Sequence, residues 1–359
     1  MLIKKNLTDG AISLLKKLIA TPSFSREEEQ TAHLIEGFFR ERNIPFSRHL
    51  NNVWAKNKYF DKNKYTILLN SHHDTVKPNN SYTRNPFSPD IEGDKLYGLG
   101  SNDAGGPLVS LLSTFEYFYS RSDLNFNLII ATTAEEEISG KNGIESLLPK
   151  LPNIDFGIVG EPTSMDLAIA EKGLIVLDCV AKGVSGHAAR EEGINAIYGA
   201  MKDMEWFSTF EFPIISKTLG KMKMSLTIIN AGSQHNVVPD ECRFTVDVRV
   251  TDAYSLEETL EIIRSNVEAE VLPRSLRLNS SGIGEGLVFL KVAKGLGFKT
   301  YGSPTLSDQA LMPFETIKLG PGQSSRSHSA DEYIKVSEIE NGVFLYIDTL
   351  DALNLALLD

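Results

Sequence analysis

The stretch that most constrains the fold is the apolar run 127–134, which ends in three consecutive carboxylates, Glu135, Glu136 and Glu137. The run is typical of a buried strand, and like charges side by side at its end resist desolvation. Such a triplet persists mainly where cations neutralise it or where one carboxylate carries protons. A solvated acidic turn is the simpler explanation for an arbitrary Glu-Glu-Glu, so the interpretation depends on what the other strand ends carry.

Other predicted strands end in similar side chains. His72 and Asp74 follow the apolar strand 65–70, Asp103 lies in the glycine-rich loop 98–106, Glu161 follows the apolar segment 155–159, and His328 follows the strand 316–320. In α/β sheets, ligands gather at the carboxyl ends of strands. Imidazole and carboxylate without thiolate suit zinc, cobalt or manganese, and this many carboxylates fit two ions better than one. Asp74 lies on the same side of an extended segment as His72 and is positioned to accept its imidazole N–H.

The order of predicted elements indicates an α/β protein with an inserted second domain. A helix at 9–20, a capping-box pattern at Ser25–Glu28 and an amphipathic helix to about Asn43 precede alternating strands and helices. From about residue 174 the order becomes βαββαβ, with strands at 174–182, 223–230, 241–251 and 272–280 and helices at 193–207 and 255–268. We therefore expect a mixed, mostly parallel sheet flanked by helices as the catalytic domain, in two parts at 1–173 and 282–359. An inserted ferredoxin-like lid or dimerisation domain is expected at 174–281.

Composition narrows the choice of partner and compartment. Lys and Arg total 36 against 47 Asp and Glu, and the resulting net charge of −11 argues against a nucleic-acid or anionic-membrane partner. The first residues lack a signal-peptide pattern, and no apolar run approaches transmembrane length. The two cysteines, Cys179 and Cys242, form no CxxC pair and are expected to be buried free thiols. We expect a cytoplasmic protein.

Taken together, five motifs in one order resemble those of the M20 metallopeptidase family, which includes acetylornithine deacetylases, succinyl-diaminopimelate desuccinylases and aminoacylases. The motifs are Ser71-His72-x-Asp74-x-Val76, Gly98-x-Gly100-x-x-Asp103, Thr133-Ala-Glu135-Glu136-Glu137, Gly160-Glu161-Pro162-Thr163, and Gly320-Pro-Gly322 with His328 and Asp331-Glu332. The resemblance implies two Zn²⁺ per subunit, with Co²⁺ as a possible substitute. It implies that His72 and Glu161 hold one ion, that Glu137 and His328 hold the other, that Asp103 bridges them, and that Glu136 is the general base.

The resemblance also assigns roles in the inserted domain. His187, in Gly183-Val-Ser-Gly-His-Ala-Ala, matches the lid histidine that relatives lend to the active site of a neighbouring subunit, which implies a homodimer formed through the lid. Asn236 and Arg249 match residues that contact substrate, and a guanidinium suits a substrate carboxylate. The chain departs from relatives at 104–106, where they often have Met-Lys-Gly, and at 303–308, a segment near the substrate.

The expected activity is removal of an acyl group from an N-acyl amino acid, with N-acetylornithine or an N-acylcitrulline of arginine biosynthesis as the first choice. A succinyl-diaminopimelate desuccinylase and a dipeptidase are the enzymatic alternatives. An inactive relative that only binds a ligand is the alternative outside enzymes, and the intact Glu136 argues against it because a binding module needs no general base.

Overall fold

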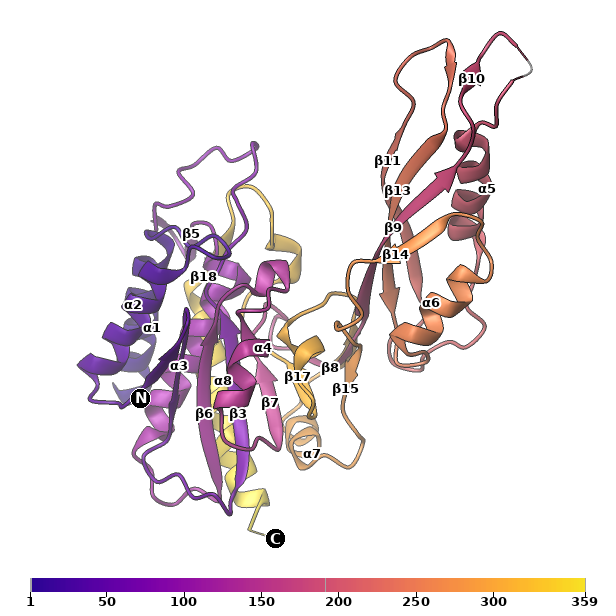
Figure 1. The fold of residues 1–359 in the computed structure, drawn as a ribbon. Helices are drawn as coiled ribbons and strands as arrows, with labels where there is room; N and C mark the ends of the chain where they lie inside the picture. The colour runs from indigo at the N-terminus through magenta and orange to yellow at the C-terminus, as the bar shows by residue number, and fades with distance from the viewer. Residues whose placement is uncertain (1, 191, 359) are drawn as a thin grey trace. The chain divides into compact units, whose positions relative to one another are not determined.

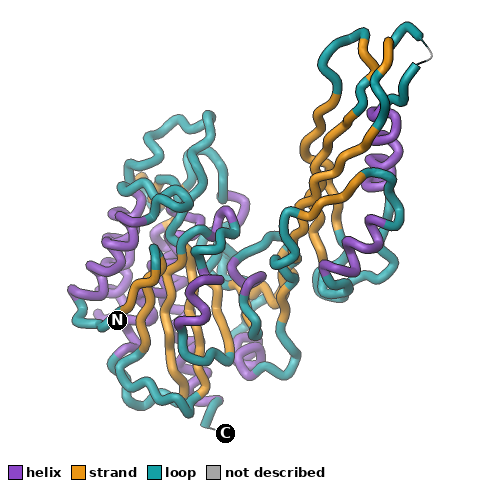
Figure 2. The backbone as a smooth tube through the Cα atoms, viewed as in Figure 1, coloured by secondary structure: helices purple, strands orange, loops and turns teal. Residues whose placement is uncertain are grey.

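The computed structural model describes residues 2–190 and 192–358, so the outer limits of the expected domains, Met1 and Asp359, lie outside the described residues. The chain divides into two compact units, drawn along the chain in Figure 1 and by secondary structure in Figure 2. Unit 1 comprises Met1–Ile169, Ile283–Tyr301 and Ser307–Asp359. Unit 2 comprises Ala170–Gly282 and Gly302–Leu306.

Unit 1 is organised around a mixed sheet with the strand order β1-β2-β6-β3-β7-β17-β8-β15, to which β16 adds by pairing with β8. The last strand of this order, β15, consists of residues of unit 2. The centre of this sheet is parallel, because β3 runs parallel to β6 and β7, and β17 runs parallel to β7. The strands are Ser47–His49 (β1), Asn52–Lys56 (β2), Tyr65–His72 (β3), Phe126–Thr133 (β6), Phe156–Val159 (β7), Leu167–Glu171 (β8), Ser281–Gly282 (β15), Thr300–Ser303 (β16) and Thr316–Lys318 (β17). The chain passes between the units within or next to β8, β15 and β16.

Both faces of the central strands are buried, which explains why their sequences are continuous apolar runs. On one face, Ile67 and Leu69 of β3 pack into the same core as residues of α1, α2, α3, α7 and α8. On the other face, Leu68 packs with Ile129 of β6 and Ile144 of α4. The helices are Leu2–Ile19 (α1), Glu29–Glu41 (α2), Gly106–Tyr119 (α3), Ile144–Leu147 (α4), Val288–Gly295 (α7) and Val336–Ala356 (α8). A small sheet, β18-β5-β4, joins Tyr333–Lys335 to Lys95–Tyr97 and Ile91–Glu92.

Unit 2 contains an antiparallel sheet with the order β11-β13-β9-β14 and two helices, in the chain order β9-α5-β11-β13-α6-β14. The elements are Gly173–Lys182 (β9), Ala196–Thr209 (α5), Lys223–Ala231 (β11), Glu241–Val250 (β13), Leu256–Arg264 (α6) and Glu270–Pro273 (β14). Alternate residues of β9 and β13, such as Leu177 and Val246, share one core with the buried faces of α5 and α6. A separate pair of short strands, Gly186–His187 (β10) and Val237–Val238 (β12), lies beyond β9.

Three local predictions were wrong. The pattern Ser25–Glu28 does not form a capping box, because α2 begins at Glu29 and Glu28, at the N-cap, makes no side-chain cap bond. The predicted strand 272–280 is limited to Glu270–Pro273, which pairs with Leu177–Val180 of β9. Residues Gly302–Leu306, expected in the second part of the catalytic domain, belong to unit 2. They are held there because the Lys172 N–H donates to the Ser303 carbonyl (3.1 Å).

Within the described residues, no helix combines the length and the apolar character that crossing a membrane requires.

Candidate metal centre

Six of the predicted side chains meet at one edge of the unit 1 sheet. His72 is the last residue of β3. Glu136 and Glu137 follow shortly after the end of β6, and Glu161 lies two residues beyond the end of β7. These three strands are neighbours in the sheet, so their carboxyl ends lie together. Asp103 reaches the same place from the short helical segment Ser101–Gly105 (η1), and His328 comes from the loop between β17 and β18.

Distances between ligand-type atoms define two groups around Asp103. His72 Nε2 lies 3.4 Å from Asp103 Oδ1 and 3.7 Å from both Glu136 Oε2 and Glu161 Oε1. His328 Nε2 lies 3.0 Å from Glu137 Oε2 and 3.8 Å from Asp103 Oδ2. The two oxygens of Asp103 therefore face different histidines, which is the arrangement that a bridging carboxylate requires.

Among the residues that the structure describes, two sets of three side chains have ligand atoms within 4.8 Å of one another, and both include His72. One set adds Asp103 and Glu137, and the other adds Glu136 and Glu161. The second set places Glu136 as close to a histidine as a ligand would be.

The hydrogen bonding of these side chains also indicates a cation site. Among the described residues, His72 Nε2 and Glu161 Oε1 are buried side-chain atoms without a hydrogen-bond partner. Buried polar atoms are nearly always satisfied, and unpaired ones point to an ion or water. Imidazole nitrogen and carboxylate oxygen facing each other at 3.7 Å suit a divalent cation such as zinc.

In the protein without cations, the pKa values of the buried site residues also indicate that these carboxylates require neutralising positive charge. Burial, reinforced by the charge of Asp103, raises the pKa of Glu161 to about 8. Burial also raises the pKa of Glu136 well above its usual range. Burial alone would lower the pKa of His72, but the charge of Glu136 and the contact with Asp103 outweigh it, and this pKa is raised well above its usual range. The carboxylates at this edge thus favour either protons or cations.

Asp74 makes contacts that the sequence did not predict. The nearest acceptor for His72 Nδ1 is the backbone carbonyl of Asp74 at 3.0 Å, while the carboxylate Oδ1 lies at 3.4 Å. The carboxylate instead accepts the backbone N–H groups of Glu136 (3.0 Å) and Glu137 (3.2 Å). Asp74 therefore orients the carboxylate turn as well as the imidazole.

Two further buried carboxylates, Glu332 and Asp308, support the site through hydrogen bonds that the sequence analysis did not predict. Glu332 accepts the backbone N–H groups of Gly100 (3.0 Å), Asn102 (2.8 Å) and Asp103 (2.9 Å). Asp308 accepts from the side chains of Asn70 in β3 (2.8 Å) and of Thr133, the last residue of β6 (2.7 Å). Glu332 belongs to a recognised motif and Asp308 to the segment that departs from relatives. No local sequence signal joins either to partners that far away along the chain.

The three predicted residues of the inserted domain all lie in unit 2. His187 is exposed on β10, and its neighbour Ala188 donates its N–H to the carbonyl of Asn236 (3.0 Å). Arg249 pairs with Leu174 at the start of β9, whereas His187 lies beyond the end of that strand. Unit 2 therefore brings His187 and Asn236 together and places Arg249 at the other end of its sheet. The guanidinium of Arg249 is paired with both oxygens of Asp247 (2.8 and 3.0 Å).

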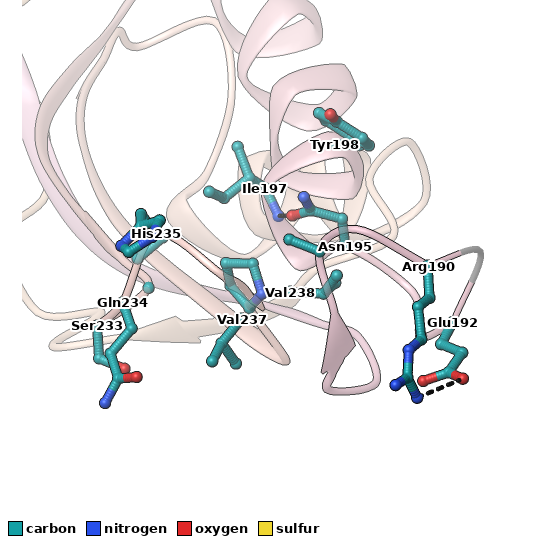
Figure 3. A pocket seen from close by; sticks show the side chains of 15 residues that line it. Arg190, Glu192, Asn195, Ile197, Tyr198, Ser233, Gln234, His235, Val237 and Val238 are labelled. Carbon is teal, nitrogen blue, oxygen red and sulfur yellow. Dashed lines mark hydrogen bonds and ion pairs between the residues drawn. The ribbon is translucent and has the colours of Figure 1, made fainter.

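A hollow of about 780 Å³ lies in unit 2, where Ala188, the residue after His187, is part of its lining (Figure 3). Its lining is largely polar and includes Asn195, Gln234 and His235, with Ala188 next to His187 itself. Arg190 and Glu192 form an ion pair of 3.6 Å at its rim.

Comparisons with known proteins agree on one family. The profile of Peptidase family M20/M25/M40 matches residues 68–352. The chain is 26% identical over 369 residues to a LysW-lysine/LysW-ornithine hydrolase of Sulfurisphaera tokodaii, covering 98% of this chain and 99% of the relative. It is 27% identical over 365 residues to an acetylornithine deacetylase of Proteus mirabilis, covering 92% and 93%. The fold is similar to that of an M20 family metallo-carboxypeptidase of Sulfolobus solfataricus, with a TM-score of 0.76 at 16% identity, covering 96% and 99%.

Proposed function

The chain belongs to peptidase family M20/M25/M40 and is a metal-dependent hydrolase that acts on amides, and from this premise we propose that it removes the acyl group from an N-acylated amino acid. The first-choice substrate is N-acetylornithine, with an N-acylcitrulline next. The observation that carries the proposal is the cluster of His72, Asp103, Glu136, Glu161 and His328 at one sheet edge, with a carboxylate to spare for proton transfer.

We assign the residues by combining this geometry with the family resemblance. His72 and Glu161 would hold one zinc ion, Glu137 and His328 the other, and Asp103 would bridge them. Such cations supply a Lewis acid for the amide carbonyl and make water more acidic. The unpaired His72 Nε2 and Glu161 Oε1 support this assignment, because a cation would satisfy both atoms.

Glu136 is proposed as the general base. Its carboxylate is largely buried, and in the protein without cations burial raises its pKa well above the usual range of glutamate, a shift that bound cations would partly offset. A general base works best when its pKa lies near the working pH. In this role Glu136 takes a proton from the attacking water and delivers it to the nitrogen of the leaving amine, which departs as the free amino acid.

His187 is proposed as the donor to the oxygen of the amide as negative charge develops there. Its Nδ1 accepts the backbone N–H of Ala189 (3.1 Å), so in the neutral ring the proton is on Nε2. Nε2 is thus a ready donor on an exposed side chain, as an oxyanion contact requires.

Unit 2 is further proposed to be a ferredoxin-like lid that forms a homodimer. Strand β11 is an edge of its sheet, and Leu226, Ile228 and Ile229 on it are 40%, 51% and 56% exposed. Tyr198 and Met201 of the neighbouring α5 are also exposed. An apolar edge strand invites pairing with another chain, and an isologous contact between two copies would cover both edges. The His187 of each subunit would then serve the site of its partner.

The choice of amino acid rests on the relatives. A LysW-lysine/LysW-ornithine hydrolase and an acetylornithine deacetylase both bear the names of diamino acids, and both align over more than nine-tenths of this chain. We therefore place a diamino acid or its citrulline analogue at the leaving amine. A succinyl-diaminopimelate desuccinylase would use the same catalytic groups with a different acyl pocket.

A hydrolysis panel tests the proposal. Zinc- or cobalt-loaded protein is incubated with N-acetyl and N-succinyl forms of ornithine, citrulline and diaminopimelate and with dipeptides, and the freed amine is measured. Turnover of N-acetylornithine or N-acetylcitrulline at least about tenfold above the other compounds supports the first choice, since discrimination between closely related substrates typically reaches that size. Preference for succinyl compounds supports the desuccinylase. Failure on every compound with metal bound means that the amidase proposal is wrong.

A further inference from the structure

Three successive backbone N–H groups of the carboxylate turn are held by carboxylates from other parts of unit 1. The N–H of Glu135 donates to Glu28 Oε1 (3.2 Å), and those of Glu136 and Glu137 donate to Asp74 Oδ1 (3.0 Å) and Oδ2 (3.2 Å). These groups precede or begin the short helical turn Glu136–Ile138, where backbone donors have no acceptor within the helix. The carboxylates thus fix the orientation of the turn.

The segment that failed as a capping box supplies both supports. Ser25 Oγ donates to Asp74 Oδ2 (2.7 Å), the same oxygen that accepts the Glu137 N–H. Glu28 has no exposed surface, and besides Glu135 it accepts from the backbone N–H of Arg26 (2.6 Å) and from Asn51 Nδ2 (2.9 Å). Two side chains three residues apart thus connect the start of α2 to the turn that carries Glu136. We call Ser25 and Glu28 the turn clamp.

The turn has a backbone that needs such support. Glu135 has φ 56° and Ser139 has φ 46°, both in the left-handed region that side-chain-bearing residues rarely adopt. Such conformations persist only where the surroundings determine them. The opposite side is packed as well: Asn142 Nδ2 donates to Glu135 Oε1 (2.9 Å), and a Cβ added at Gly140 would lie 2.0 Å from Glu135 Oε2. Glu28 therefore fixes the backbone of Glu135 by a hydrogen bond, and Gly140 and Asn142 pack against or bond to its side chain.

We propose that Ser25 and Glu28 are positioning residues for the reaction, setting Glu136 as base and Glu137 as metal ligand through the backbone of their turn. This proposal rests on the proposed function for its catalytic consequence, but its effect on metal binding does not require a substrate. Ser25 acts by orienting the Asp74 carboxylate toward two N–H groups, and Glu28 acts directly on the residue before Glu136. In this proposal neither side chain is a metal ligand, and neither contacts the reacting atoms.

The test compares Ser25→Ala and Glu28→Gln with two matched controls. Ser25→Thr keeps the hydroxyl, and Glu27→Gln removes a charge from an exposed side chain in the same segment. Each protein is measured for kcat and KM on the best panel substrate, for Co²⁺ affinity by absorbance titration of the metal-free protein, and for thermal unfolding. Groups that support metal ligands and catalytic residues typically contribute roughly 10–100-fold to affinity or activity.

We expect Ser25→Ala and Glu28→Gln to lower kcat about tenfold with KM changed less than about twofold, and to weaken Co²⁺ binding about tenfold. Ser25→Thr and Glu27→Gln should stay within about twofold of the wild type. If both clamp variants lower the unfolding temperature but keep kcat and Co²⁺ affinity, the clamp is structural only and the proposal is wrong. If Glu28→Gln does not fold, the Ser25→Ala and Ser25→Thr pair decides. If the wild type hydrolyses nothing, the proposed function fails while the Co²⁺ titrations still decide on the clamp.

Discussion

Replacing Glu161 by Gln should make the metal-free protein more stable at alkaline pH, although it removes a proposed zinc ligand. Burial and the charge of Asp103 raise the pKa of Glu161 to about 8 in the folded protein without cations, from an ordinary value of 4.5. A carboxyl with a raised folded-state pKa gives full stability below its unfolded pKa. That stability is lost as the pH rises through the folded pKa, because the folded state must then hold a buried charge. The loss therefore falls between about pH 4.5 and pH 8.

The size of the loss follows from the shift. Moving from 4.5 to about 8 corresponds to an upper limit of about 5 kcal/mol at ~1.4 kcal/mol per pH unit. Glu161 is 9% exposed, so solvent screening is slight in the rigid structure. Entry of water into the metal-free site reduces the penalty, and we expect about 2–3 kcal/mol to be measurable. Glutamine is neutral at all pH values and escapes the loss.

The assay uses the two tryptophans of the chain, Trp54 in β2 of unit 1 and Trp206 in α5 of unit 2. In a Trp206→Phe background, fluorescence follows unit 1, and urea unfolding of chelator-treated protein gives the free energy of unfolding at pH 5 and pH 8.5. Glu161→Gln should match its parent near pH 5 and exceed it at pH 8.5. With saturating zinc the order should reverse, because the parent gains more binding energy.

Two results would refute this reasoning. One is that metal-free Glu161→Gln loses as much stability between pH 5 and pH 8.5 as its parent. The other is that Glu27→Gln, whose side chain is exposed, gains as much stability as Glu161→Gln. Either result would mean that the pH dependence arises elsewhere than in the desolvated Glu161 carboxylate.

Three further predictions concern the proposed roles. Glu136→Gln should lower kcat by about 10²–10⁴ while zinc content by elemental analysis stays near that of the wild type, whereas Glu137→Gln should lose zinc; the opposite order would mean that the two roles are exchanged. Mixing His187→Ala with Glu136→Gln under conditions that exchange subunits should restore activity, because the mixed dimer contains one complete site; no recovery despite proven exchange would place His187 in its own subunit or outside catalysis. Ile229→Lys on the edge strand β11 should shift the protein to a monomer in light scattering, while Leu272→Lys on the opposite edge strand β14 should not, and equal effects would contradict dimerisation through β11.

The parts of the fold that sequence predicted well are those where one physical signal dominates. Strands β3 and β6 are buried on both faces, so their apolar runs were visible without any knowledge of their neighbours. The chain order β9-α5-β11-β13-α6-β14 could likewise be predicted, because strand-like and helix-like residue patterns alternate from residue 174 onward. Ser25–Glu28 failed because its composition matches a cap, while its side chains bond to Asp74 and Glu135, which are distant in the sequence. Tertiary partners overrode a local rule there.

The site divides in the same way. His72, Asp103, Glu137, Glu161 and His328 could be proposed as metal ligands because such ligands come from few residue types and are expected at strand ends. The carboxylates that support them could not, since Glu332 accepts backbone N–H groups and Asp308 accepts side-chain donors from other elements, and both resemble any buried acid in sequence. Their contacts are visible only once the fold brings the loops together.

The distribution of the proposed ligands along the chain has a consequence for how the protein is made. His72 is synthesised in the first quarter of the chain, and His328 belongs to its last tenth. A ribosome that has released β3, β6 and β7 has delivered only one of the two proposed histidine ligands, and His328, the contact of Glu137, is still untranslated. Under the proposed assignment, a second cation would be captured only after almost the whole polypeptide has emerged, and a message truncated before codon 328 would yield a chain that lacks one ligand of that ion.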